Sequence, residues 1–122
     1  MTRNPRVLLV EDNPDTVEFL ARRLREEGYE VLVARNGVDA WRLANQDPLD
    51  AIVMDINLPQ LDGDEVARRL RAQPETVAIP IIFVTAETAA RVQDLLVPGH
   101  TLCLEKAIKS RTLLEALTQV LA

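Results

Sequence analysis

The chain has 122 residues, of which 48% are hydrophobic and 27% charged, a balance typical of one globular domain. Its net charge of −5 and its 3% aromatic content argue against a nucleic-acid-binding protein, which needs a basic surface and stacking side chains. No apolar run reaches the roughly eighteen residues of a membrane span, and the single cysteine, Cys103, is typical of the reducing cytoplasm. We therefore expect one cytoplasmic domain over residues 1–122.

Five short apolar runs predict five β-strands. They are "RVLLV" (6–10), "YEVLVA" (29–34), "AIVM" (51–54), "IPIIFV" (79–84) and "TLCL" (101–104). Four of the runs are nearly continuous rather than alternating, which is the pattern of strands buried on both faces of a parallel sheet.

A helical pattern follows each of these runs. Helix starts are predicted at Asn13 with Pro14 behind it, at Asn36, at Asp62 and at Ser110, because short polar side chains cap the free N–H groups of a first turn. Asp62 with Glu65 three positions later resembles a capping box. The fourth segment, over residues 87–96, has the weakest pattern. The inward-facing positions follow helical spacing and are Val17, Leu20, Ala21, Leu24, Ala40, Trp41, Ala44, Val66, Ala67, Leu70, Leu113, Leu117, Val120 and Leu121.

Strands and helices that alternate five times predict an α/β fold. The expected architecture is a (βα)5 doubly wound five-stranded parallel sheet, with helices on both faces and right-handed crossovers between the strands. In such open sheets, ligands bind outside the carboxyl ends of the strands.

Residues with charged or hydrogen-bonding side chains, suited to binding or catalysis, follow four of the predicted strands. Glu11 and Asp12 come after the first, Asp55 after the third, Thr85 after the fourth and Lys106 after the fifth. Like charges about 4 Å apart repel by roughly 4 kcal/mol at an effective dielectric of about 20, so a cluster of three carboxylates needs either a cation or raised pKa values. Oxygen ligands suit Mg²⁺, a lysine suits an anion and a hydroxyl donates a hydrogen bond. Each residue alone fits a structural role, but together they favour a site.

Other site chemistries fit this chain poorly. A dinucleotide site needs glycines after the first strand, where the chain reads "VEDNPD". A phosphatase with Asp55 as nucleophile needs a second carboxylate two positions later, where Asn57 stands. His100 lies in a Pro-Gly turn, and we expect a surface residue there rather than one of a catalytic pair.

Four segments, taken in order, resemble a known family. They are "LVEDN", "DINLPQLDG", "PIIFVTAE" and "CLEKA". The chain is similar to the receiver domain of bacterial two-component response regulators, of the single-domain chemotaxis type. The resemblance implies a flavodoxin-like strand order of 2-1-3-4-5 and a signalling module rather than an enzyme.

The resemblance also implies roles for the residues at the strand ends. Asp55 would accept a phosphoryl group from a histidine of a sensor histidine kinase or a histidine phosphotransfer protein. Asp12 and Asp55 would bind Mg²⁺ directly, together with the backbone carbonyl of Asn57, and Glu11 would bind it through water. The phosphoryl oxygens would be held by Thr85 and Lys106.

Two positions depart from the family pattern. Cys103 replaces the usual aromatic residue, and Ala107 replaces the proline after the lysine, so we expect a trans bond between Lys106 and Ala107. A phosphorylated switch would bind a downstream protein or a second copy of itself as a homodimer. The alternative is a pseudo-receiver, in which the face "VPGHTLCLEKAI" binds a partner without any phosphorylation. Polar residues at Asn57 and Glu87 leave room for an attacking water and favour a short-lived phosphoryl group.

Overall fold

The computed structural model describes residues 4–86, 88–106 and 110–122. The predicted peptide geometry between Lys106 and Ala107 and the predicted position of Glu87 lie outside these ranges. Within them, no helix combines the length and the apolar character needed to cross a membrane.

The five predicted strands are all present, with a helical segment after each. The order along the chain is β1 (Arg6–Val10), α1 (Pro14–Glu26), β2 (Glu30–Ala34), α2 (Gly37–Gln46), β3 (Ala51–Met54), α3 (Gly63–Arg71), β4 (Ile81–Thr85), η1 (Ala89–Leu95), β5 (Thr101–Glu105) and α4 (Ser110–Leu121). All strand pairs are parallel, in the order β2-β1-β3-β4-β5. The fold class and the strand order predicted from the sequence are confirmed.

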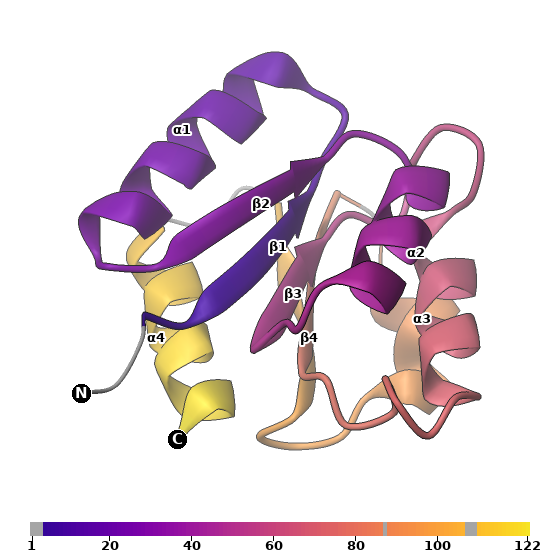
Figure 1. Cartoon of the computed structure of the whole chain (residues 1–122). Helices are drawn as coiled ribbons and strands as arrows, with labels where there is room; N and C mark the ends of the chain where they lie inside the picture. Colours follow the sequence, from indigo (N-terminus) through magenta and orange to yellow (C-terminus); the bar gives the residue numbers. More distant parts are fainter. Residues whose placement is uncertain (1–3, 87, 107–109) are drawn as a thin grey trace.

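Helices cover the sheet on both faces (Figure 1). One apolar cluster joins alternate strand residues, such as Leu8, Ile52 and Phe83, to α2, α3 and η1. The other joins the intervening strand residues, such as Leu9 and Val53, to α1 and α4. Because every residue of β3 and β4 is buried, their sequences carry no polar alternation.

The helix starts agree with the sequence at Asn13, Asn36 and Asp62, but only the two asparagines make capping hydrogen bonds. Asn13 accepts hydrogen bonds from the backbone N–H groups of Asp15 and Thr16, and Asn36 accepts one from Asp39. Asp62 precedes α3 but makes no capping hydrogen bond, so the predicted capping box is wrong. Its side chain instead accepts from the backbone of the preceding loop and from an arginine of η1.

The fourth helical segment, η1, is a 3₁₀ helix and not an α-helix. Val92 is its one fully buried residue, so it lacks the apolar stripe that holds a longer α-helix against a sheet. The turn after it brings Val97 and Thr101 together through two backbone hydrogen bonds. Gly99 has a φ of 73° in this turn, a conformation that favours glycine after Pro98.

Candidate functional site

The strand register brings the predicted site residues to one edge of the sheet. Val10 of β1 lies opposite Met54 of β3, so the next residues along the two strands, Glu11 and Asp55, leave the sheet side by side. Thr85 is the last residue of β4 and lies opposite Glu105 of β5. The backbone N–H of Lys106 donates to the carbonyl of Thr85 at 2.8 Å.

Lys106 joins the two buried carboxylates of this edge. Its ammonium lies 2.7 Å from Oε1 of Glu11 and 2.7 Å from Oδ2 of Asp55. These two carboxylate residues are only 4% and 7% exposed, respectively. Partial burial of Lys106 opposes its charged form. The hydrogen bonds that its ammonium donates to Asp55 and Glu11, and the negative charges of these carboxylates, outweigh that effect, so the pKa of the ammonium is raised.

Asp12 completes a carboxylate cluster with Glu11 and Asp55. Each of the three offers one carboxylate oxygen, and these oxygens lie within 4.8 Å of one another. The second oxygen of Glu11 accepts from the backbone N–H of Asn13 at 3.0 Å, which orients that side chain. One exposed and two buried carboxylates form a hard, all-oxygen donor set, and this set fits Mg²⁺.

The other two predicted residues lie around this cluster. Thr85 is 1% exposed at the end of β4 and meets Lys106 through its backbone. Asn57 is exposed, and its backbone N–H donates to Oδ1 of Asp55 at 3.3 Å. The structure therefore gathers all the predicted site residues at one edge of the sheet. The side chain of Asn57, however, forms its hydrogen bond with a residue outside this set.

The loop between β3 and α3 is held by its own apolar residues and by a close backbone contact. Ile56 and Leu58 are buried in the core on either side of exposed Asn57. The N–H of Gly63 donates to the carbonyl of Ile56 at 2.7 Å. A Cβ atom at Gly63 would lie 2.1 Å from the backbone oxygen of Asp55, so only glycine allows this approach.

Arg91 of η1 is a site neighbour that the sequence reading missed. It donates to the side-chain oxygen of Asn57 at 3.0 Å and pairs with Asp62 and Asp64. An arginine six positions beyond Thr85 carries no local signal of this role, because its partners come from a different part of the chain.

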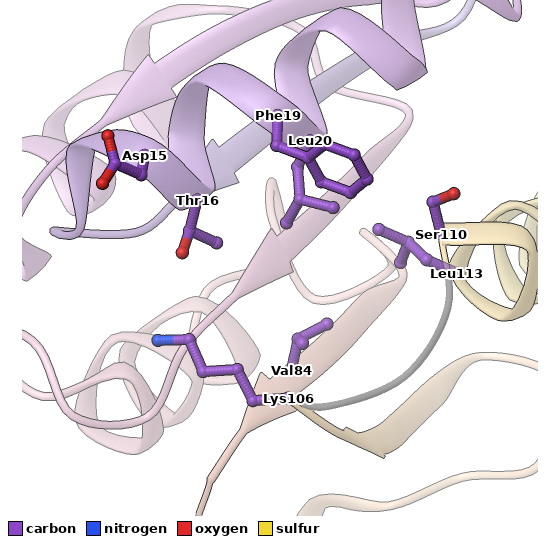
Figure 2. A pocket seen from close by; sticks show the side chains of 8 residues that line it. All are labelled: Asp15, Thr16, Phe19, Leu20, Val84, Lys106, Ser110 and Leu113. Carbon is purple, nitrogen blue, oxygen red and sulfur yellow. The ribbon is translucent and has the colours of Figure 1, made fainter.

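An apolar cavity of about 320 Å³ adjoins the site between α1 and α4. Figure 2 shows Phe19 and Leu20 of α1 pointing toward Val84 and Leu113, with Lys106 below α1. The full lining is Asp15, Thr16, Phe19, Leu20, Val84, Lys106, Ser110 and Leu113. Phe19 is 50% exposed. In the sequence it could have been noticed as a large apolar residue that lies outside the buried stripe of its helix.

His100 differs from its predicted place on the open surface. Its ring is partly buried, with Nδ1 2.8 Å from the hydroxyl of Thr101 and Nε2 3.0 Å from the carbonyl of Ala78. It lies before β5, at the opposite edge of the sheet from the carboxylate cluster. It therefore anchors the loops of that edge and takes no part in the candidate site.

Two known proteins are similar in sequence to most of this chain. Protein PilH of Pseudomonas aeruginosa is 38% identical over 120 residues, which cover 96% of this chain and 98% of PilH. Transcriptional regulatory protein PrrA of Mycobacterium bovis is 41% identical over 92 residues. This match covers 75% of the chain but only 40% of PrrA, so the chain spans well under half the length of that relative.

Solved structures show the same fold. The receiver domain of the sensor histidine kinase PA1611 from Pseudomonas aeruginosa PAO1 superposes with a TM-score of 0.86 and 35% sequence identity. The match covers 97% of this chain and 98% of that domain, which has a magnesium ion coordinated in its active site cleft. A family model, the response regulator receiver domain, matches residues 7–118. The chain thus belongs to the response regulator receiver domain family.

Proposed function

We propose that this protein is a phosphoacceptor of two-component signalling and that Asp55 takes the phosphoryl group. The observation that carries the proposal is the position of Lys106, whose ammonium lies 2.7 Å from both Asp55 and Glu11. Lys106 is a cation held between two buried carboxylates, next to exposed Asp12. Its positive charge suits this site to receive an anion at Asp55.

In the proposed transfer, Asp55 is the nucleophile. A carboxylate oxygen of Asp55 bonds to phosphorus while the bond to the donor histidine nitrogen breaks, and the electron pair stays on the imidazole. The donor is a histidine of a sensor histidine kinase or of a histidine phosphotransfer protein. Phosphoryl transfer asks a protein mostly for positioning and charge neutralisation, and the short, buried β3 strand holds Asp55 rigidly for both.

The proposed magnesium ligands are Glu11, Asp12, Asp55 and the carbonyl of Asn57. Bound Mg²⁺ supplies positive charge that neutralises phosphoryl oxygens. Its fit rests on the three carboxylate oxygens within 4.8 Å of one another.

The chain itself supplies the remaining contacts. A phosphoryl group adds about −1.5 to −2 charge at Asp55, and Lys106 already lies within ion-pair distance of that carboxylate. The hydroxyl of Thr85 is the proposed donor to a phosphoryl oxygen, since Thr85 ends the strand beside Asp55. The phosphoryl charge would compete with Glu11 and Asp55 for the ammonium of Lys106. We propose that the resulting change in the ion pairs of Lys106 alters binding to a downstream protein or to a second copy of the chain.

The cavity between α1 and α4 supports a partner that approaches beside Lys106. Half-exposed Phe19 and partly buried Leu20 offer apolar surface there, next to the polar site. The free thiol of Cys103 supports a cytoplasmic location for the exchange.

Mass spectrometry of the intact protein tests this function. Incubation with Mg²⁺ and acetyl phosphate should add the mass of one phosphoryl group to the wild type and none to Asp55→Asn. Asp12→Ala should weaken Mg²⁺ binding and labelling together, while Glu75→Gln, an exposed carboxylate beyond α3, should label as the wild type does. Labelling of Asp55→Asn at the wild-type level would contradict the assignment, and a wild type that never labels would favour the pseudo-receiver.

A further inference from the structure

We infer that Arg91 is a positioning residue that prolongs the life of the phosphoryl group on Asp55 by holding the side-chain oxygen of Asn57. The inference rests on the proposed function and adds the control of hydrolysis at that same site.

Arg91 connects η1 to the loop that follows Asp55. Its Nη1 donates to Oδ1 of Asn57 at 3.0 Å, and its Nη2 donates to Oδ2 of Asp62 at 3.0 Å and to Oδ1 of Asp64 at 2.8 Å. The guanidinium is a planar fork of donors, so one arginine can hold an amide and two carboxylates together.

Two further contacts keep this fork in place. Oδ1 of Asp62 accepts from the backbone N–H of Leu58 at 3.3 Å, which ties the carboxylate to the loop itself. On the other side, Arg68 of α3 donates to the backbone carbonyl of Arg91 at 3.0 Å and also pairs with Asp94. The backbone and the side chain of Arg91 are therefore both anchored to α3 and its preceding loop.

The chemistry of the pair fixes which way the Asn57 amide faces. An arginine has no acceptor, so the atom that meets it must be the amide oxygen and not the NH₂ group. A hydrogen bond from a cation also draws electron density from that oxygen, which makes it a weaker acceptor for any second donor.

Asn57 stands where water meets the buried carboxylate. Asp55 is 7% exposed, whereas Asn57 is exposed and joined to it by a backbone hydrogen bond of 3.3 Å. In hydrolysis, a water oxygen bonds to phosphorus and the bond from phosphorus to the Asp55 oxygen breaks. The electron pair returns to the carboxylate, inorganic phosphate leaves and the proton lost by the water goes to solvent.

An acceptor near the attacking water speeds this reaction, because it orients the water with its lone pair toward phosphorus. The amide oxygen of Asn57 is such an acceptor, and Arg91 holds and weakens it. Loss of Arg91 frees this oxygen for the water, so the phosphoryl group should leave sooner.

The experiment measures the half-life of the phosphoryl group on the full chain. Each protein is labelled with Mg²⁺ and acetyl phosphate, the donor is removed, and the loss of phosphoryl mass is followed. Arg91→Ala should shorten the half-life by about three- to tenfold, the effect of one hydrogen bond on a barrier. Arg91→Lys keeps the charge without the fork and should also shorten it.

A double variant separates the positioning role from a general structural one. In an Asn57→Ala background, which has no amide oxygen to release, adding Arg91→Ala should leave the half-life unchanged. Arg69→Ala is the matched control, because it removes an exposed arginine paired with Glu65 on α3. Its half-life should equal that of the wild type, and thermal unfolding should show that all variants are folded.

The outcomes distinguish this inference from the proposed function. A wild type that labels, with equal half-lives in Arg91→Ala and Arg91→Lys, overturns the inference and leaves the function standing. So does a shortening by Arg91→Ala that persists without Asn57. A wild type that never takes up phosphoryl overturns the proposed function and the inference with it.

Discussion

The ammonium of Lys106 lies 2.7 Å from Oδ2 of Asp55, although 51 positions separate the two residues in the chain. It makes a second ion pair of 2.7 Å with Glu11. Removal of this cation leaves two buried carboxylates without compensation. We therefore expect Lys106→Met to lower the free energy of unfolding by about 1–3 kcal/mol at neutral pH, the effect of leaving buried polar groups unsatisfied. Urea unfolding measures this change.

Mg²⁺ should restore the stability of Lys106→Met. The ion neutralises the carboxylate cluster, so it should raise the unfolding midpoint of this variant more than that of the wild type. Arg111→Met is the control, since the Arg111 side chain is 86% exposed and pairs with Glu115 across a helix turn. A midpoint of Lys106→Met that does not respond to Mg²⁺ would argue against a carboxylate cluster balanced by Lys106.

The alkaline limit of this stabilisation follows from the raised pKa of Lys106. A cation whose folded pKa exceeds its ordinary value of 10.5 contributes its full stability below that value. The contribution is lost as the pH rises through the raised folded pKa. The difference in unfolding free energy between the wild type and Lys106→Met should thus stay constant from neutral pH to about pH 10 and shrink above it. A difference that already declines near neutral pH would contradict this sign.

Gly63→Ala should damage both stability and the site. The new Cβ atom would lie 2.1 Å from the backbone oxygen of Asp55, a distance that forces the loop and α3 apart. We expect a loss of about 1–3 kcal/mol in unfolding free energy and weaker phosphoryl labelling. Glu65→Ala, an exposed change in the same first helical turn, is the control. Equal urea midpoints for the two variants would show that the close approach is absent.

Thr101→Val should lower stability without affecting phosphorylation. Thr101 is 1% exposed, and its hydroxyl accepts from Arg71 at 2.8 Å and lies 2.8 Å from Nδ1 of His100. Burial already lowers the pKa of Arg71, so losing this acceptor should cost about 1–3 kcal/mol. Thr118→Val, an exposed change on α4, controls for the loss of a hydroxyl. Urea unfolding measures the change in stability, and labelling by acetyl phosphate measures phosphorylation. Slower labelling of Thr101→Val would contradict the expectation that this edge of the sheet does not affect the candidate site at the opposite edge.

Thr85→Ala should uncouple partner binding from phosphorylation more than Cys103→Ala does. Thr85→Ala removes the hydroxyl that we propose as a donor to a phosphoryl oxygen, whereas Cys103 lies within β5, opposite Phe83, and packs against the core. Burial raises the pKa of the Cys103 thiol, which fits a small packing residue rather than a reactive one. Affinity for the partner, with and without the phosphoryl group, compares the variants. A larger loss of coupling in Cys103→Ala would refute this order.

The sequence by itself determined the architecture and the residues that end the strands. Continuous apolar runs and helical spacing are local patterns, and they alternated often enough to predict a parallel sheet. Once that sheet was predicted, the edge at which Glu11, Asp55 and Lys106 would gather followed from the direction of the strands. Asn13 and Asn36 were readable as caps because a cap and its partners lie within one helical turn.

Only the tertiary structure decided how the loops around the site are held. Asp62 has the sequence of a capping residue, yet its carboxylate turns to Arg91, which lies 29 positions further along the chain. Arg91 reaches Asn57 across 34 positions, and Phe19 meets the cavity that α4 and β4 complete. These contacts depend on the packing of η1 against α3 and of α1 against α4, and neither packing leaves a periodic signal in the residues that make it. Local patterns therefore placed the chemistry at one edge, and long-range packing decided which side chains surround it.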